Sequence, residues 1–150
     1  MSYDEPVLNH VGQAVADLDR AITFYIDLLG FTLDRRIQVP DAGTVPLLGL
    51  APPLGLDVAY LRLGSFTLEL MQFRDSENPA WRERVFNEPG LTHLSVSVVD
   101  LAATLDRVEA LGGQLVTRLP VAAMIRDPDG QLLELLTMDY RRRLDNPTVS

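Results

Sequence analysis

The chain has 150 residues, 47% of them hydrophobic, which is enough to bury the core of one domain or of two small modules. Its net charge of −8 argues against nucleic acid as a partner, because phosphates demand a basic face. No apolar run approaches the roughly 18 residues of a membrane span, and the N-terminus lacks a signal-peptide pattern, which predicts a cytoplasmic protein. Because the chain has no cysteine, any metal must be held by His, Asp or Glu.

The chain opens with a predicted strand, a helix and a second strand. Residues 6–16 alternate as a strand, and its His10 face carries only small neighbours, which leave a hollow. Asp17 is a good N-cap for a helix with an apolar stripe, and Gly30 suits the left-handed residue that follows it. Residues 31–39 read as the next strand.

Residues 40–55 interrupt this pattern. Four prolines and three glycines in this stretch predict that no regular element forms there. The segment is interpreted either as a long surface connection or as a mobile flap over a site, since long ordered loops are often functional. Its many apolar side chains favour a hydrophobic organic substrate.

Two further strands are predicted at 56–63 and 65–73, joined by a turn at Gly64. Glu69 lies between two leucines in the second of them. A carboxylate in so apolar a strand must be paired or metal-bound to offset its desolvation. Residues 74–90 are polar and are predicted to form a linker with a short helix, in which Trp81 either anchors the linker or covers a partner or ligand.

The second half of the chain repeats these signals from Leu91 onward. His93 again shares its strand face with small residues, Asp100 is placed to cap a helix, and Gly113 follows the helix end. Strands at 114–118, 121–126 and 131–137 are predicted to follow, and the last carries Glu134 between leucines. Residues 139–150 are expected to be a frayed, solvated tail.

The two halves align in one register without a gap. The following residues of the first half match the second: Leu8, His10, Val15, Asp17, Leu18, Leu28 and Gly30 correspond to Leu91, His93, Val98, Asp100, Leu101, Leu111 and Gly113. We interpret this as an internal duplication. The predicted organisation is module 1 at about 6–73, the linker at 74–90 and module 2 at about 91–138.

The repeated histidines and glutamates form the candidate site. The only two histidines occupy one repeat-equivalent position, and both glutamates lie at the centre of an apolar strand. If the modules are related by a pseudo-twofold axis, His10, Glu69, His93 and Glu134 converge. Two imidazole nitrogens and two carboxylate oxygens suit one divalent ion, either Zn, Ni, Co, Mn or Fe.

The sequence resembles the vicinal oxygen chelate superfamily, which includes glyoxalase I, methylmalonyl-CoA epimerase, extradiol dioxygenases and bleomycin-resistance proteins. The resemblance runs from His10 to about Met138. The motifs that carry it are Asn9-His10-Val11-Gly12, Asp17-Leu18, Phe24-Tyr25, Leu28-Leu29-Gly30-Phe31, Thr92-His93-Leu94, Arg126-Asp127-Pro128-Asp129-Gly130 and Leu133-Glu134-Leu135. It implies an α+β fold of paired βαβββ modules that form a half-barrel cleft. It also implies a metal in that cleft, within one chain or between subunits, and a homodimer.

The ligand pattern His, Glu, His, Glu is similar to that of glyoxalase I. The resemblance implies a metal-dependent lyase or isomerase that acts on a small vicinally oxygenated or carbonyl substrate through a metal-stabilised enediolate. Glu134 would be the catalytic base and Glu69 its symmetry-related counterpart. Glyoxalase I has a glutathione-binding arginine where this chain has Ala14, which argues against a plain glutathione adduct as substrate.

Other functions within the superfamily remain open. One is a ligand-binding or resistance protein that sequesters an apolar natural product without chemistry, although its members often lack the ligand set that is complete here. An epimerase would need a second carboxylate base, for which Asp57 is the nearest candidate. A dioxygenase relies on a further histidine, and none is left.

Overall fold

The computed structural model describes residues 4–79, 82–83 and 85–146, so Trp81 lies outside the described residues. The chain divides into two compact units. Unit 1 comprises residues 1–22 and 31–78, and unit 2 comprises residues 23–30 and 79–150, so the division falls within the first helix. Each unit contains one four-stranded mixed sheet.

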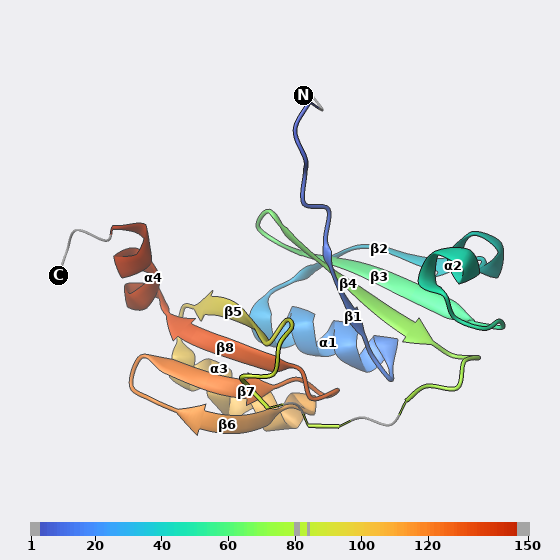
Figure 1. Ribbon diagram of the computed structural model, residues 1–150. Coiled ribbons are helices and arrows are strands. Elements are labelled where there is room, and N and C mark those ends of the chain that lie inside the picture. The colour runs from blue at the N-terminus through green and yellow to red at the C-terminus, as the bar shows by residue number, and fades with distance from the viewer. Residues whose placement is uncertain (1–3, 80–81, 84, 147–150) are drawn as a thin grey trace. The chain divides into compact units, whose positions relative to one another are not determined.

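Unit 1 contains the sheet of the first repeat. Its strands are β1 (Val11–Ala14), β2 (Thr32–Val39), β3 (Leu56–Leu63) and β4 (Phe66–Phe73), in the spatial order β1-β4-β3-β2 (Figure 1). β1 is parallel to β4, and the β4–β3 and β3–β2 pairs are antiparallel. Helix α1 (Leu18–Leu29) connects β1 to β2. β1 is shorter than the predicted strand, so His10 lies one residue before it.

Unit 2 repeats this topology. Its strands are β5 (His93–Val98), β6 (Gln114–Arg118), β7 (Ala122–Arg126) and β8 (Leu132–Thr137), in the order β5-β8-β7-β6. Helix α3 (Leu101–Val108) and the short 3-10 helix η1 (Glu109–Leu111) connect β5 to β6, and α3 packs against β6, β7 and β8. The predicted α+β fold of two βαβββ modules is therefore confirmed.

The structure confirms the helix ends that were predicted from Asp17, Asp100 and Gly30. The carboxylate of Asp17 accepts a hydrogen bond from the Arg20 backbone N–H at 2.9 Å, and Asp100 accepts one from Ala103 at the same distance. Each satisfies a donor that the first helical turn leaves free. Gly30 follows α1 with a φ of 77°, a conformation that costs glycine no side-chain clash.

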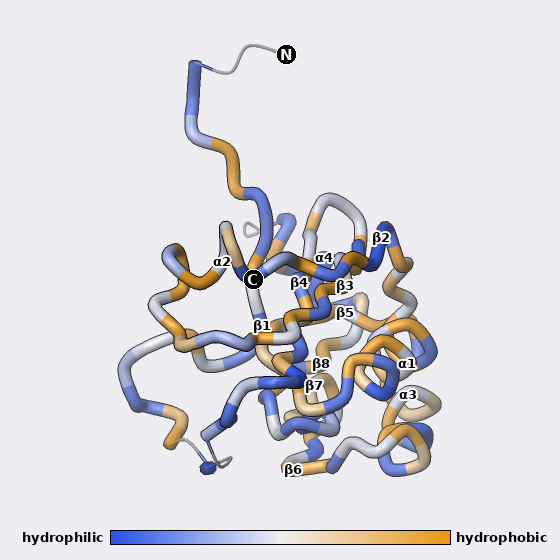
Figure 2. Tube along the Cα trace, turned by 90° about the vertical axis from the view of Figure 1, so that its right-hand side faces the viewer, coloured by the Kyte–Doolittle hydropathy of each residue, from blue (hydrophilic) through white to orange (hydrophobic). Residues whose placement is uncertain are grey.

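Alternation along the strands buries one face of each sheet. Leu68 and Leu70 on β4 have no exposed surface, and neither do Leu133 and Leu135 on β8. Residues between these leucines point to the opposite, open face. Helices α1 and α3 likewise carry hydrophobic and hydrophilic residues in succession, as Figure 2 shows. Burial of the leucines therefore turns the intervening glutamates toward the open faces.

The prediction that residues 40–55 hold no regular element was wrong. Helix α2 (Asp41–Leu48) forms there with Pro46 inside it. Pro46 has no backbone N–H, so the helix lacks the hydrogen bond that this residue would otherwise donate. Other bonds stabilise its ends: Thr44 Oγ1 donates to the Pro40 carbonyl at 2.9 Å, and the Gly49 N–H donates to the Val45 carbonyl at 3.0 Å.

Helix α2 covers part of the open face of unit 1 (Figure 1). Val45 packs against the buried cluster of Leu54, Leu56 and Val58, and the carboxylate of Asp41 accepts a hydrogen bond from the Leu54 backbone N–H at 3.2 Å. Residues 40–55 are thus an ordered cover on this face. Their role as a mobile flap stays a prediction.

Two smaller predictions also need correction. The tail begins with an exposed helix, α4 (Met138–Asp145), in which Arg142 pairs with Asp139 and Arg141 with Asp145. These pairs at helical spacing favour a helix over a frayed end. The described residues of the 74–90 linker include no helix. Among the described helices, none is long and apolar enough to cross a membrane.

Candidate metal site

The first His–Glu pair lies on the open face of unit 1. Glu69 is at the centre of β4, where its register partners are Gly12 on β1 and Tyr60 on β3. Nε2 of His10 lies 3.0 Å from Oε2 of Glu69, and the two side chains are 37% and 14% exposed. The apolar strand therefore does pair its carboxylate, as its desolvation requires.

Tyr60 binds the other oxygen of the Glu69 carboxylate. Its hydroxyl donates to Oε1 of Glu69 at 2.7 Å, and the Arg35 guanidinium lies 4.5 Å from the centre of its ring. The hydrogen bond to Glu69 is the main reason that the pKa of Tyr60 is raised above its ordinary value, so the phenol stays a donor. Tyr60 is not among the site residues predicted from the sequence.

Gly12 leaves room for the carboxylate. A Cβ at this position would lie 3.1 Å from Cε of Met71, closer than most side-chain contacts, and 3.4 Å from Oε2 of Glu69, in van der Waals contact. Gly12 thus lies close against both side chains, and a larger residue would crowd them. The hollow beside His10 stays a prediction.

The second pair lies at the equivalent place in unit 2. Glu134 on β8 is flanked by its register partners Ser95 on β5 and Met124 on β7. Nε2 of His93 lies 3.8 Å from Oε2 of Glu134, with side chains 27% and 32% exposed. Ser95 Oγ donates to the same carboxylate oxygen at 2.7 Å. Glu134 is therefore more open to solvent than Glu69, and it is bound by a different neighbour.

The other ring nitrogen of His93 has its own partner. Nδ1 lies 2.9 Å from the hydroxyl oxygen of Thr92. With the hydrogen on Nδ1, the imidazole donates to Thr92 and leaves the lone pair of Nε2 free. This is how a second contact sets the tautomer of a metal-binding histidine.

The turn Asp127-Pro128-Asp129-Gly130 organises the start of β8. Oδ1 of the buried Asp127 accepts backbone hydrogen bonds from Asp129 and Gln131, at 2.9 and 2.8 Å, and Oδ2 accepts one from the Tyr25 hydroxyl at 3.0 Å. The amide of Gln131 donates to the Thr92 carbonyl at 3.2 Å. The turn thus ties β8 to the residue before His93, which positions the second pair.

The chemistry of the two pairs fits a divalent ion. Two ligands about 2.1 Å from one metal and roughly 90–110° apart are separated by about 3.0–3.4 Å. The His10–Glu69 distance of 3.0 Å falls in this range, and the His93–Glu134 distance of 3.8 Å is slightly longer. In the described part of the chain, no group of three or more His, Asp or Glu side chains is close enough to hold a metal. Each unit therefore supplies a pair, and their convergence on one ion stays a prediction.

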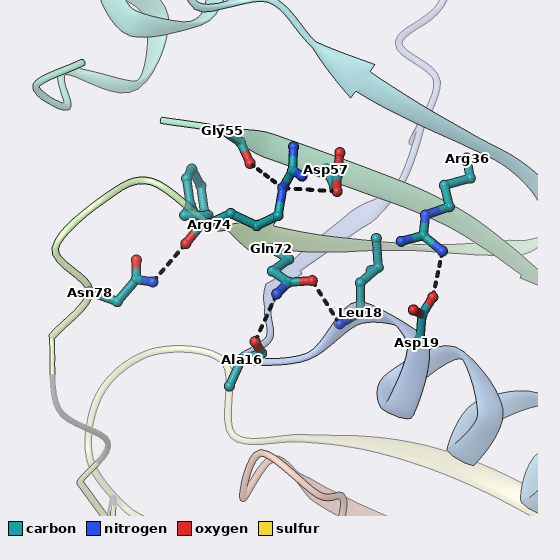
Figure 3. A network of polar contacts seen from close by, with 10 residues as sticks. Ala16, Leu18, Asp19, Arg36, Gly55, Asp57, Gln72, Arg74 and Asn78 are labelled. Atoms are coloured by element: carbon teal, nitrogen blue, oxygen red, sulfur yellow. Dashed lines mark hydrogen bonds and ion pairs between the residues drawn. The ribbon is translucent and has the colours of Figure 1, made fainter. Parts of the chain in front are cut away.

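Asp57 does not support an epimerase. It pairs in register with Gln72, whose amide side chain accepts a hydrogen bond from the Leu18 N–H at 3.0 Å and donates one to the Ala16 carbonyl at 3.1 Å (Figure 3). Asp57 therefore faces the helix side of the sheet, opposite to Glu69, and its Oδ2 lies 3.1 Å from Nε of Arg74. A base beside the Glu69 carboxylate cannot come from this position.

Known proteins resemble the chain over most of its length. Residues 7–135 match the family model of the glyoxalase/bleomycin resistance protein/dioxygenase superfamily. A lactoylglutathione lyase from Pseudomonas aeruginosa is 32% identical, with 88% of this chain and 82% of the relative covered. A probable lactoylglutathione lyase from Synechocystis is 27% identical, with 90% and 98% covered.

A solved structure supports the same assignment at the level of the fold. A glyoxalase family protein from Bacillus cereus superposes with a TM-score of 0.77 at 22% identity, covering 91% of this chain and 97% of that one. The repeated four-stranded sheet and the family match over residues 7–135 point to the same family. The chain belongs to the glyoxalase/bleomycin resistance protein/dioxygenase superfamily.

Proposed function

We propose that the protein is a divalent-metal-dependent lyase or isomerase of the glyoxalase type. His10, Glu69, His93 and Glu134 are the metal ligands in this proposal, supplied by one chain or by two subunits of a homodimer. The observation that carries it is the repetition of the pair: in each unit a histidine at the start of the first strand faces a glutamate at the centre of the fourth. Similarity to lactoylglutathione lyases supports the same reaction class.

The two glutamates have different surroundings, which suits different roles. Glu69 is bound by His10 and Tyr60 and is 14% exposed, so it is held as a ligand. Glu134 is 32% exposed, lies farther from its histidine and is hydrogen-bonded to Ser95, so its carboxylate is more accessible to a substrate. Glu134 takes the proton from the carbon beside the substrate carbonyl and returns it to the adjacent carbon. When bound, the ion acts as a Lewis acid for the negative charge on the substrate oxygens.

The substrate is a small carbonyl or vicinally oxygenated molecule other than a plain glutathione adduct. Position 14 is an exposed alanine on β1, which offers no charge to a glutathione carboxylate. Ordered apolar residues of the 40–55 segment on the open face of unit 1 favour an apolar substrate. A second candidate function, capture of an apolar ligand without chemistry, is favoured by the mostly apolar hollow of unit 2.

Metal analysis of protein purified without added metal tests the proposal. We expect about one ion per set of four ligands, lost in Glu134→Gln and in His93→Ala. Glu109→Gln, on an exposed 3-10 helix, is the matched control and should keep the metal. Native mass spectrometry on diluted protein separates the two arrangements: a site within one chain keeps its ion in the monomer, whereas a site shared by two subunits loses it when the dimer dissociates.

The reaction class is tested by solvent exchange. Incubation with carbonyl substrates in D₂O should place deuterium on the carbon beside the carbonyl, and Glu134→Gln should abolish this while the fold persists. Oxygen consumption with catechols would instead indicate a dioxygenase. Protein that binds no divalent ion, with an intact circular dichroism spectrum, would refute the metal-dependent enzyme and leave the ligand-capture function.

A further inference from the structure

A hollow of about 460 Å³ lies in unit 2, on the open face of β7 and β8. Small-molecule pockets in proteins typically measure about 300–1,000 Å³ and combine apolar walls with a few polar groups. Here most of the wall is apolar, and it includes Phe86, Val116, Met124 and Leu132. The hollow is therefore the right size for a small organic molecule.

Among the described residues that line this apolar hollow, Arg126 carries the positive charge. The side chain of Arg126 is only 13% exposed. Nη1 donates to the Gly130 carbonyl at 3.0 Å, and Nη2 donates to Oε1 of Glu83 at 2.5 Å. A guanidinium withdrawn from water in this way needs an anionic partner, because desolvation of an unpaired charge is costly.

The resident anion is suited to being replaced. The side chain of Glu83 is 68% exposed, so water screens its charge and competes for its carboxylate oxygens. A carboxylate inside the hollow would make charge-assisted hydrogen bonds to the same guanidinium in a drier place. Its apolar body would at the same time cover Met124 and Leu132.

The sheet register places this cation beside the second His–Glu pair. Arg126 pairs with Leu132, and Leu132 pairs with His93. Arg126 and His93 are thus two strand spacings apart, about 10 Å. Phe86 joins the two places, because it lines the hollow and stacks on the His93 ring with centroids 5.4 Å apart.

We infer that Arg126 is the anion-binding residue of a pocket for an organic carboxylate with an apolar body, and that Glu83 occupies the guanidinium until such a ligand displaces it. The pocket's role in holding the substrate rests on the proposed function. Binding of the anion itself is independent of the proposed function, since neither Arg126 nor Glu83 is a proposed metal ligand. The inferred substrate class is a carboxylate whose oxygenated reacting end extends from Arg126 toward His93 and Glu134.

Calorimetric titration of metal-free protein tests the pocket without reference to catalysis. The probes are 4-phenylbutanoate and its neutral amide, which share one apolar body. We expect the carboxylate to bind at least about 10-fold more tightly than the amide, the gain of about one charge-assisted hydrogen bond. Arg126→Met should remove this difference, whereas Arg118→Met, on the exposed neighbouring strand β6, should keep it.

Glu83→Gln distinguishes an anion that competes with the ligand from an ion pair that is only structural. If Glu83 competes with the ligand, this variant binds 4-phenylbutanoate several-fold more tightly and the amide unchanged. Equal binding of the two probes by the unaltered protein, or weaker carboxylate binding by Glu83→Gln, would overturn the inference. Metal loss in Glu134→Gln bears on the proposed function alone, so the two failures are distinguishable.

Discussion

The phenol of Tyr60 donates a hydrogen bond of 2.7 Å to Oε1 of Glu69, while Oε2 of the same carboxylate lies 3.0 Å from Nε2 of His10. Contacts of this kind orient a metal ligand, and their loss typically weakens metal binding about 10–100-fold. Tyr60→Phe should therefore lower the affinity for Co²⁺ by about 10-fold in a calorimetric titration. Tyr140→Phe, on the exposed helix α4, is the control. Unchanged affinity in Tyr60→Phe would show that His10 alone orients Glu69.

The raised pKa of Tyr60 makes one contribution to stability pH-dependent. The hydrogen bond to Glu69 favours the protonated phenol in the folded state, so the folded-state pKa exceeds the ordinary value of 10.0. This contribution is fully present below pH 10 and is lost as the pH rises through the folded-state pKa. The urea midpoint of metal-free protein should therefore fall more steeply above pH 10 than that of Tyr60→Phe. Parallel curves would contradict the assignment.

Replacement of Gly12 tests the space beside Glu69. In Gly12→Val the new Cβ would press on Cε of Met71, and the two methyl groups beyond it would crowd Oε2 of Glu69, so we expect the carboxylate to shift. We expect metal affinity to fall about 10-fold. Thermal stability should change little, because Gly12 is exposed. Ala14→Val, also exposed on β1, is the control and should leave metal binding intact.

Asp127 should matter for stability more than any exposed carboxylate. Asp127→Ala leaves the N–H groups of Asp129 and Gln131 without this acceptor and removes the partner of the Tyr25 hydroxyl. Each lost buried hydrogen bond costs about 1 kcal/mol, so the free energy of unfolding should fall by about 2–4 kcal/mol. Asp139→Ala, whose side chain is 77% exposed, should change it by less than about 0.5 kcal/mol. Urea denaturation measures both.

Duplication made much of the fold predictable. Asp17 and Asp100 signal helix starts, and the strands at 56–63 and 114–118 have the predicted bounds, because alternation and capping act locally. Helix α2 was missed for the opposite reason. Its hydrogen bond to Leu54 and the packing of Val45 on a distant cluster outweigh the local preference of proline and glycine against a helix.

The repeat positions in the sequence predicted the histidine and the glutamate of each pair. They did not predict the residues that surround the pairs. A tight turn at Gly64 would have placed Tyr60 opposite Glu69, and would have put Asp57 opposite Gln72 on the other face. The hairpin register was therefore a usable signal. Arg126 could not be found in this way, because its role depends on Glu83, which no periodic pattern connects to β7.

The connection between β2 and β3 carries an ordered helix, whereas the equivalent connection between β6 and β7 is only Leu119–Val121. The two repeats thus differ in length at this hairpin end, while both keep the antiparallel pairing of the flanking strands. Because Val45 and Leu54 of this segment pack in the cluster on the open face, a change here alters the wall of that face as well as the connection itself. Chimeras that exchange residues 40–55 among homologues are accordingly a direct route to new ligand preferences.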